Sequence, residues 1–255
     1  MRLAETEYAP EAETAPPLVV AHGLFGAAKN WRAHAKRFGA GRRVIAVDMR
    51  NHGESGWDAR HDYPAMAEDL AETIEAAGGR AALLGHSMGG KAAMALAQTR
   101  PELIEKLIVA DIAPVAYRHD LLDEIEAMRA VDLASMTRRS EVQDAIAARI
   151  DAPGVAAFLA HSARLGEAPG WALNLDALAE NMPLITGYPD LDGVYDGPAF
   201  FLLGAKSDYV RVEHREKILR LFPNASHKAL AGAGHWLHAD KPREFLDAVN
   251  EFLSA

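Results

Sequence analysis

The sequence contains no cysteine, and this absence excludes several kinds of chemistry at once. Disulfide bonds, thiolate-bound zinc, iron–sulfur clusters and a cysteine nucleophile all need a thiol. Long apolar runs are also missing, because no segment approaches the roughly 18 consecutive apolar residues that indicate a transmembrane helix. Residues 1–17 carry several acidic side chains and no apolar stretch, unlike a signal peptide. We therefore expect a cytoplasmic protein without a membrane span.

Positive charge is in deficit as well. The chain has 27 Lys and Arg residues against 36 Asp and Glu residues, so its formal net charge is -9. A nucleic-acid-binding protein needs a basic face for the phosphates, and we exclude that class. The 255 residues, 49% of them hydrophobic, suffice for one large core without disulfides or metals.

Short apolar runs alternate with helical patterns along most of the chain. Because strands that alternate with helices form βαβ units, these runs predict a mainly parallel sheet flanked by helices. Arg2–Tyr8 predicts an antiparallel edge strand, and helices are expected at Met88–Thr99 and Lys241–Phe252. The predicted core strands are Leu18–His22, Arg43–Asp48, Ala81–Leu84, Lys106–Asp111, Ala199–Leu203 and Ser226–Leu230.

The segment 114–189 differs from the rest, because it is rich in helical patterns and contains no convincing strand. A single βα crossover needs only one helix. We therefore interpret residues 114–189 as a helical cap over the strand ends, and residues 1–113 and 190–255 as the core. The alternative is a set of ordinary core helices. The helices expected in this segment are Leu121–Ala130, Glu141–Ile150 and Val155–Arg164.

The motif G-x-S-x-G stands at Gly85–Gly89, between a predicted strand and a predicted helix. In that context it is typical of a nucleophile elbow, in which small neighbours permit a strained turn that lifts the serine hydroxyl clear of the sheet. The N-terminus of the following helix favours negative charge that develops nearby. We predict that Ser87 is a nucleophile.

The same residues nearly match a phosphate-binding loop. Gly85 to Lys91 follows the pattern G-x-x-x-x-G-K, and the strand that ends at Asp111 resembles the one that holds magnesium in such proteins. However, Ala92 occupies the position where that motif requires Ser or Thr for the metal. A P-loop nucleotide binder is therefore a remote alternative.

A serine hydroxyl needs a base, and the base needs an orienting group. His235 lies between the last predicted strand and the final helix, where the sites of open α/β folds form, and is the candidate base. His238 follows, but no acidic third ligand stands at helical spacing, so we predict no metal site. Asp111 and Asp208 each follow a strand, and the order Ser…Asp…His fits either acid.

Backbone donors for an oxyanion are expected at two turns. His22–Gly26 follows the first central strand with a glycine-containing turn. By analogy with folds that carry this elbow, the donors are the N–H groups of Leu24 and Met88. The run Asp48–Ser55 follows another strand, and we interpret its polar side chains as hydrogen-bonding braces for loops near the site.

Together, HGLFG, DMRNHGES, GHSMGG and AGAGHWLHADKP resemble the α/β-hydrolase superfamily, and more closely its small bacterial esterases of the YbfF type, related to the abhydrolase-domain-11 proteins. The resemblance extends from His22 to Pro242. In that family pattern Ser fills the usual acid position, here Ser207, and the acid ends the preceding core strand, here Asp111. The resemblance therefore implies Asp111 as the acid and Ser207 as a supporting hydrogen-bond partner. The adjacent Asp208 leaves a conventional triad open.

The resemblance also implies an activity. WALNLDAL, which begins at Trp171, resembles a segment of the family's cap, so Trp171 is predicted to bind substrate. Family members hydrolyse carboxylic esters or acyl thioesters through an acyl-enzyme, which requires a small-molecule substrate and no cofactor. Alternatives on the same fold are a C–C hydrolase, a lactonase, a cofactor-free peroxidase, and a ligand receptor with vestigial turnover.

Overall fold

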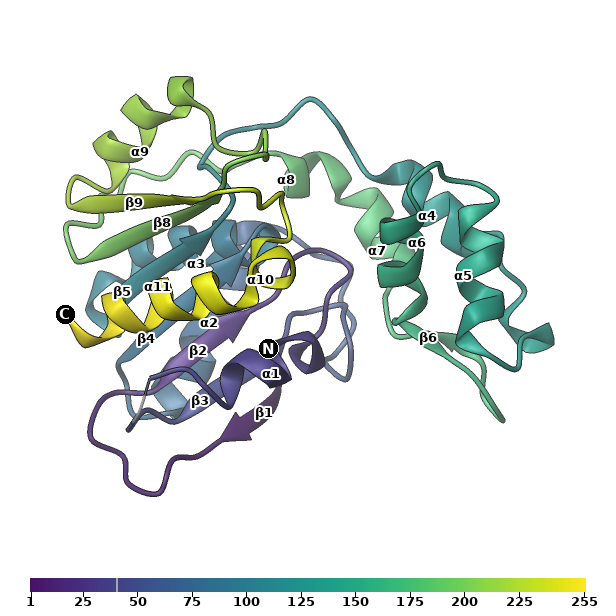
Figure 1. Cartoon of the computed structure of the whole chain (residues 1–255), viewed down its shortest axis with the longest axis horizontal. Helices are drawn as coiled ribbons and strands as arrows, with labels where there is room; N and C mark the ends of the chain where they lie inside the picture. Colours follow the sequence, from purple (N-terminus) through teal and green to yellow (C-terminus); the bar gives the residue numbers. More distant parts are fainter. Residues whose placement is uncertain (40) are drawn as a thin grey trace.

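The computed structural model describes residues 1–39 and 41–255 of the chain. Within these residues a seven-stranded sheet has the order β1-β3-β2-β4-β5-β8-β9 (Figure 1). β1 is antiparallel to β3, and the other neighbouring strands of this sheet are parallel. The strands are β1 Ala4–Tyr8, β2 Leu18–Ala21, β3 Val44–Asp48, β4 Ala81–His86, β5 Ile104–Ala110, β8 Ala199–Gly204 and β9 Ala225–Leu230.

The sequence pattern explains why these segments are strands. Every residue of β2, β3 and β4 is buried, as expected for parallel strands covered on both faces. β1 lies at the edge and leaves most of its side chains exposed. The predicted strands are confirmed with ends that differ by at most two residues.

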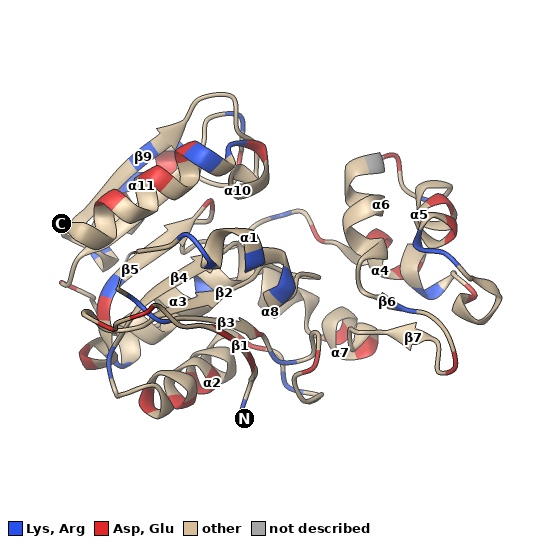
Figure 2. Ribbon diagram, turned by 60° about the horizontal axis from the view of Figure 1, so that its bottom comes forward, with Lys and Arg blue, Asp and Glu red and all other residues tan. Residues whose placement is uncertain are grey.

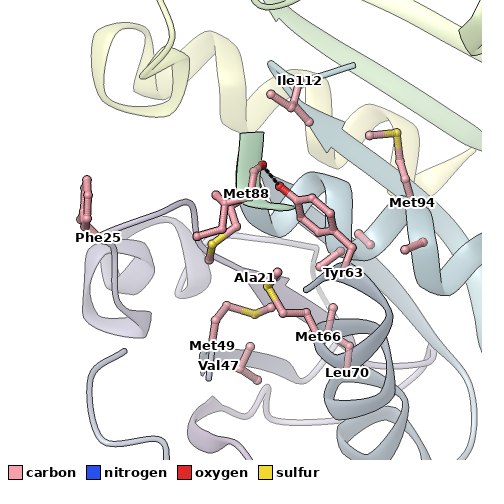
Figure 3. Packing of buried hydrophobic residues seen from close by; sticks show 14 of the residues in the cluster. Ala21, Phe25, Val47, Met49, Tyr63, Met66, Leu70, Met88, Met94 and Ile112 are labelled. Carbon is pink, nitrogen blue, oxygen red and sulfur yellow. Dashed lines mark hydrogen bonds between the residues drawn. The ribbon is translucent and has the colours of Figure 1, made fainter. Parts of the chain in front are cut away.

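Helices cover both faces of the sheet. Ala21 of β2 belongs to the core cluster that includes Met66 of α2 (Figure 3), whereas the preceding Val20 belongs to the opposite cluster with Phe245 of α11. Charged residues gather on the helices, such as α2, α5 and α11, while β4 carries none (Figure 2). The core helices are α1 Arg32–Ala35, α2 Tyr63–Ala76, α3 Met88–Thr99, α9 Arg215–Leu221, α10 Leu237–Asp240 and α11 Pro242–Ser254. In the described part of the chain, no helix combines the length and apolar character needed to cross a bilayer.

Between β5 and β8 the chain leaves the sheet and forms a group of helices at the right of Figure 1. The predicted helices are present, but the second ends at Ala147 instead of Ile150 and the third at Ala160 instead of Arg164. The prediction that this segment lacks strands is wrong, because β6 and β7 pair as a short hairpin. Gly166, with φ 106°, permits the connecting turn, and strands this short carry no alternating pattern. The elements are α4 Leu122–Arg129, α5 Arg139–Ala147, α6 Pro153–Ala160, β6 Ala163–Arg164, β7 Gly170–Trp171, α7 Leu175–Glu180 and α8 Met182–Thr186.

The second half of this insertion is tied to the core at two places. The Tyr63 hydroxyl of α2 donates to the Ile185 carbonyl at 2.5 Å (Figure 3). In the loop after β3, the Gly53 N–H donates to the Ala172 carbonyl at 2.7 Å, and Asn51 accepts two hydrogen bonds from Asn174. The family-like segment that begins at Trp171 is therefore an anchor for the insertion.

Candidate active site

Ser87 occupies the turn between β4 and α3, and its backbone has a conformation that residues other than glycine rarely adopt (φ 52°, ψ -119°). The neighbouring glycines are required by close contacts. A Cβ at Gly85 would lie 2.2 Å from the Gly89 carbonyl oxygen, and a Cβ at Gly89 would lie 2.4 Å from the Ala21 oxygen. Backbone strain of this kind persists only where the surrounding structure holds it, and it concentrates at functional sites.

A continuous chain of hydrogen bonds joins the predicted nucleophile, the predicted base and one candidate acid. His235, between β9 and α10, has Nε2 3.0 Å from Ser87 Oγ and Nδ1 2.8 Å from Asp111 Oδ2. Asp111 is fully buried after β5, and its carboxylate also accepts the Gly204 N–H at 2.8 Å and the Ser207 hydroxyl. A carboxylate at Nδ1 favours the Nδ1–H tautomer, which leaves Nε2 able to accept the serine proton.

The other candidate acid lies outside this chain. The Asp208 side chain is 88% exposed and lies 3.7 Å from the Arg211 guanidinium. The adjacent Ser207 points inward to Asp111, and its Oγ also accepts the Tyr209 N–H at 3.3 Å. The structure therefore brings Asp111 and Ser207 to His235 and leaves Asp208 in solvent.

The two residues predicted to supply the oxyanion donors line cavities that reach Ser87. Leu24 and Ser87 line one cavity, and Met88 joins them in a smaller one. Neither the Leu24 N–H nor the Met88 N–H donates to a backbone acceptor within the described residues. Met88 is the first residue of α3, so the helix dipole adds to the attraction for a negative oxygen.

A cavity of about 450 Å³ opens beside Ser87 and His235. The insertion and the loop after β9 supply much of its apolar lining, namely Leu121, Val155, Phe158 and Trp236. A second cavity of about 40 Å³ also reaches Ser87. Polar groups at the floor and apolar walls above are the usual design of a site for a small organic molecule.

Trp171, the predicted substrate-binding residue, lines neither of these cavities. It lies in β7, where it pairs with Ala163 of β6. The following residues bond to the loop after β3, so this segment faces the core loop instead of the site. The aromatic side chain that the insertion contributes to the larger cavity is Phe158 of α6, whose ring centroid lies 5.3 Å from that of Trp236.

Two residues that hold His235 were missed in the sequence. His86 donates from Nε2 to the His235 carbonyl at 2.9 Å, and the Tyr209 ring stacks on the His235 ring at 3.9 Å between centroids. Burial, followed by the neighbouring histidines, holds the pKa of His86 well below its ordinary 6.5, so it acts as a neutral donor. His86 stands inside the G-x-S-x-G motif and could have been found there, whereas Tyr209 left no local signal.

Lys91, the residue that suggested a P-loop, is buried and bound to two backbone carbonyls. Its Nζ donates to the Thr186 and Gly187 carbonyls at 2.9 and 2.5 Å. Burial lowers the pKa of Lys91 to about 7. Asp111, the proposed magnesium ligand of that alternative, is engaged by His235. The arrangement gives the nucleotide-binding alternative no support.

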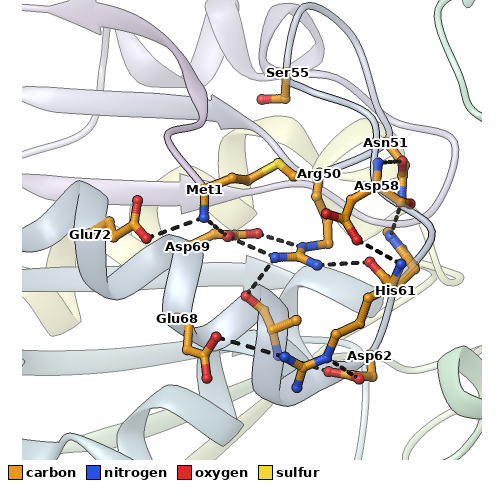
Figure 4. Close-up of polar contacts among 12 residues, drawn as sticks. Met1, Arg50, Asn51, Ser55, Asp58, His61, Asp62, Glu68, Asp69 and Glu72 are labelled. Atoms are coloured by element: carbon orange, nitrogen blue, oxygen red, sulfur yellow. Dashed lines mark hydrogen bonds and ion pairs between the residues drawn. The ribbon is translucent and has the colours of Figure 1, made fainter.

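The polar side chains of the run Asp48–Ser55 connect the loop after β3 to neighbouring segments by hydrogen bonds, as the sequence indicated. Arg50 forms a buried ion pair with Asp69 of α2, with nitrogen–oxygen distances of 2.6 and 2.9 Å (Figure 4). Asp48 Oδ1 accepts the Ala28 N–H at 2.7 Å, which connects this loop to the loop after β2.

Residues 18–248 match the model of a family described as "Alpha/beta hydrolase family". The chain belongs to this family. It is 40% identical over 240 residues to "Esterase YbfF" of Escherichia coli (strain K12), which covers 93% of each chain. It is 39% identical over 251 residues to "sn-1-specific diacylglycerol lipase ABHD11" of Mus musculus, with 94% of this chain and 82% of that protein covered. A solved structure titled "Marine microorganism esterase" has a TM-score of 0.90 and 33% identity, with 98% of this chain and 99% of that chain covered.

These similarities confirm the predicted α/β-hydrolase fold and the predicted resemblance to esterases of the YbfF type. They also confirm the class of enzyme, a carboxylic ester hydrolase, because relatives matched over most of the chain are named as esterases and lipases. The roles of individual residues are a separate question, which the geometry of the site addresses.

Proposed function

We propose that this chain is a serine esterase that cleaves small-molecule carboxylic esters or acyl thioesters, with Ser87 as nucleophile, His235 as base and Asp111 as acid. The observation that carries the proposal is the hydrogen-bonded chain from Ser87 Oγ through His235 to the buried Asp111, at the floor of a partly apolar cavity. No cofactor takes part in this chemistry.

Acylation begins when His235 Nε2 takes the proton of Ser87 Oγ and the oxygen attacks the substrate carbonyl. The Leu24 and Met88 N–H groups donate to the oxyanion of the tetrahedral intermediate. Asp111 stabilises the imidazolium that forms, and the Ser207 hydroxyl supports the Asp111 carboxylate. His235 then protonates the leaving alcohol or thiol, and an acyl-enzyme remains on Ser87.

Deacylation repeats these steps with water as the nucleophile. His235 removes a proton from the water, which attacks the acyl carbonyl, and the same two N–H groups receive the oxyanion. His235 returns the proton to Ser87 Oγ as the carboxylic acid leaves. The stacked Tyr209 ring and the His86 hydrogen bond hold the imidazole in place during both half-reactions.

We further propose that residues 114–189 act as a cap over a core made of residues 1–113 and 190–255. Leu121, Val155 and Phe158 of this insertion line the cavity beside Ser87, which supports the assignment. Such a cap determines which apolar groups of a substrate fit into the cavity. A cytoplasmic location also belongs to this proposal, and cell fractionation tests it.

The test is steady-state hydrolysis of p-nitrophenyl esters and acyl thioesters of graded chain length, together with covalent labelling by a fluorophosphonate. We expect many turnovers per enzyme, one label per chain, and loss of both activity and label in Ser87→Ala. Ser140→Ala, a change at an exposed position of α5, is the matched control and keeps both. Turnover or labelling that survives in Ser87→Ala overturns the assignment of the nucleophile. A single slow turnover of the unmodified protein instead indicates a receptor.

A further inference from the structure

His22 and His52, called the histidine pair below, exchange hydrogen bonds between the two loops that follow β2 and β3. His22 Nε2 lies 2.9 Å from the Met49 backbone nitrogen, and His52 Nε2 lies 3.1 Å from the Phe25 backbone nitrogen. Each ring belongs to one loop and accepts an N–H from the other. The two ring centroids are 5.0 Å apart, and both side chains are at most 1% exposed.

The backbone donors dictate the protonation state of both rings. Because an amide N–H can only donate, each Nε2 must carry a lone pair, and the proton of each neutral ring must sit on Nδ1. Each Nδ1–H has a carbonyl acceptor at 2.8 Å: Gly23 for His22 and Arg50 for His52. Burial lowers the pKa of His22 to about 4 and that of His52 to about 3, which keeps both rings neutral near pH 7.

The acceptor of His22 is part of the oxyanion peptide itself. The Gly23 carbonyl and the Leu24 N–H belong to one planar trans peptide, so they point in opposite directions. His22 Nδ1–H at 2.8 Å and the Gly26 N–H at 2.9 Å both donate to the Gly23 oxygen. Two donors on this carbonyl fix the peptide plane, and they polarise the Leu24 N–H through the shared amide.

His52 fixes the next peptide of the same loop. Phe25 has a left-handed backbone, with φ 63°, and is 6% exposed. Without the acceptor at His52 Nε2, the Phe25 N–H has no other hydrogen-bond partner within the described residues, and a buried unpaired N–H costs about 1 to 3 kcal/mol. The loop would relax out of its strained conformation, and the Leu24 N–H would move with it.

We propose that the histidine pair positions the oxyanion hole: His22 orients and polarises the Gly23–Leu24 peptide, and His52 holds the strained Phe25 peptide beside it. Both are positioning residues, because they act on the oxyanion through the backbone of the loop after β2. This inference rests on the proposed function, because it assigns a role toward the oxyanion of an ester substrate. The insertion contacts the loop after β3 at this point, since Leu173 forms a β-bridge with His52.

The test separates the two ring nitrogens with amide side chains. In His52→Gln the side-chain oxygen can replace the Nε2 acceptor, whereas His52→Asn can replace only the Nδ1 donor, and His52→Phe replaces neither. We expect His52→Phe and His52→Asn to lower kcat about 10- to 100-fold, less than the outright loss of an oxyanion donor, with KM within about twofold. His52→Gln should recover kcat to within about threefold of the unmodified enzyme.

At His22 the order reverses, because the oxyanion peptide needs the Nδ1 donor. We expect His22→Asn, which keeps a donor for Gly23, to retain more activity than His22→Gln. In each variant, the affinity for a trifluoromethyl ketone, which forms a tetrahedral oxyanion on Ser87, should fall in step with kcat. His227→Gln, an exposed change in β9, is the matched control and alters neither quantity.

Equal kcat in His52→Gln and His52→Phe, or ketone affinity that stays constant while kcat falls, overturns the inference. Thermal melting identifies a variant that does not fold. Nitrogen–proton NMR correlations of the unmodified protein report the tautomer of each ring, with the Gln variants used only to assign the signals. This measurement does not depend on the activity of any variant. Both rings should be protonated at Nδ1, and an Nε2–H tautomer on either ring overturns the inference. Failure of the proposed function instead appears as an unmodified protein without turnover that depends on Ser87.

Discussion

Replacing Asp111 by asparagine preserves the size of the side chain and converts one carboxylate oxygen into an NH₂ donor. In the native side chain, Oδ1 accepts the Gly204 N–H, and Oδ2 accepts the Ser207 hydroxyl and His235 Nδ1–H. An asparagine that keeps the bond to Gly204 presents its NH₂ group to His235 Nδ1. This contact favours the Nε2–H tautomer, which has no lone pair for the Ser87 proton.

The expected loss is large, because Asp111 is fully buried and water cannot replace its charge. In a serine protease the corresponding change lowers kcat about 10⁴-fold, which equals about 5.5 kcal/mol at about 1.4 kcal/mol per tenfold. Ser207→Ala removes one hydrogen bond to the carboxylate, worth about 1.5 to 3 kcal/mol, so kcat should fall about 10- to 150-fold. Asp208→Asn should change kcat by about twofold or less, because that side chain is 88% exposed.

The assay is kcat and KM for the three variants on one ester, with circular dichroism to confirm that each is folded. The order Asp111→Asn, Ser207→Ala, Asp208→Asn, from most to least impaired, is the expected result. If Asp208→Asn is crippled while Asp111→Asn stays near the unmodified enzyme, the conventional triad holds and the reasoning from the buried carboxylate is wrong. A pH profile of Asp111→Asn adds a check, because hydroxide can partly replace an impaired base and activity should then rise toward alkaline pH.

Three further predictions follow from packing and burial. The histidine pair has its pKa values lowered from 6.5 to about 4 and about 3, so the unfolded chain binds protons first as the pH falls. Urea denaturation should show the free energy of unfolding decreasing from about pH 6.5 toward 5, by up to about 1.4 kcal/mol per pH unit for each histidine, and a flat dependence contradicts this. Phe158→Ala should shift the acyl-length preference while Trp171→Ala leaves it unchanged, measured with a graded ester series; the opposite result returns Trp171 to the pocket. Gly89→Ala should destabilise the fold by about 3 kcal/mol or more in thermal melting, because its Cβ would lie 2.4 Å from a carbonyl oxygen, whereas Gly170→Ala meets no atom within 4 Å and should be mild.

Local patterns sufficed for the core strands and for the nucleophile. Apolar runs mark the strands of a covered parallel sheet, and the Gly85–Gly89 turn has a motif of its own. The acid was different, because Asp111 and Asp208 each follow a strand and no local pattern says which one faces His235. The resemblance to a family supported Asp111, and the packing of β5 against β8 supplies the physical reason, since it brings Ser207 and Gly204 to that carboxylate.

Contacts between remote segments could not be predicted. Tyr209 stacks on His235, and Lys91 binds the Thr186 carbonyl, yet neither contact has a sequence signature. The placement of Trp171 outside the two cavities at Ser87 has the same origin. An aromatic residue in a cap-like segment suggests a pocket wall, but the turn at Gly166 and the pairing of β6 with β7 direct the segment toward the loop after β3.

The register of the sheet explains how Ser87 and Asp111 come within reach of one imidazole. Both leave their strands with a positive φ, 52° and 53°, which costs on the order of 1–3 kcal/mol at each residue. Their N–H groups nevertheless continue the ladder, since Ser87 donates to Ala110 at 3.0 Å and Asp111 donates to Leu202 at 2.9 Å. The last ladder bond holds each backbone in place while the reversed φ turns the side chain over the edge of the sheet. Because β4 is held by β5 and β5 by β8, the distance that His235 bridges depends on strand register, and the loops supply only the imidazole and the Leu24 N–H.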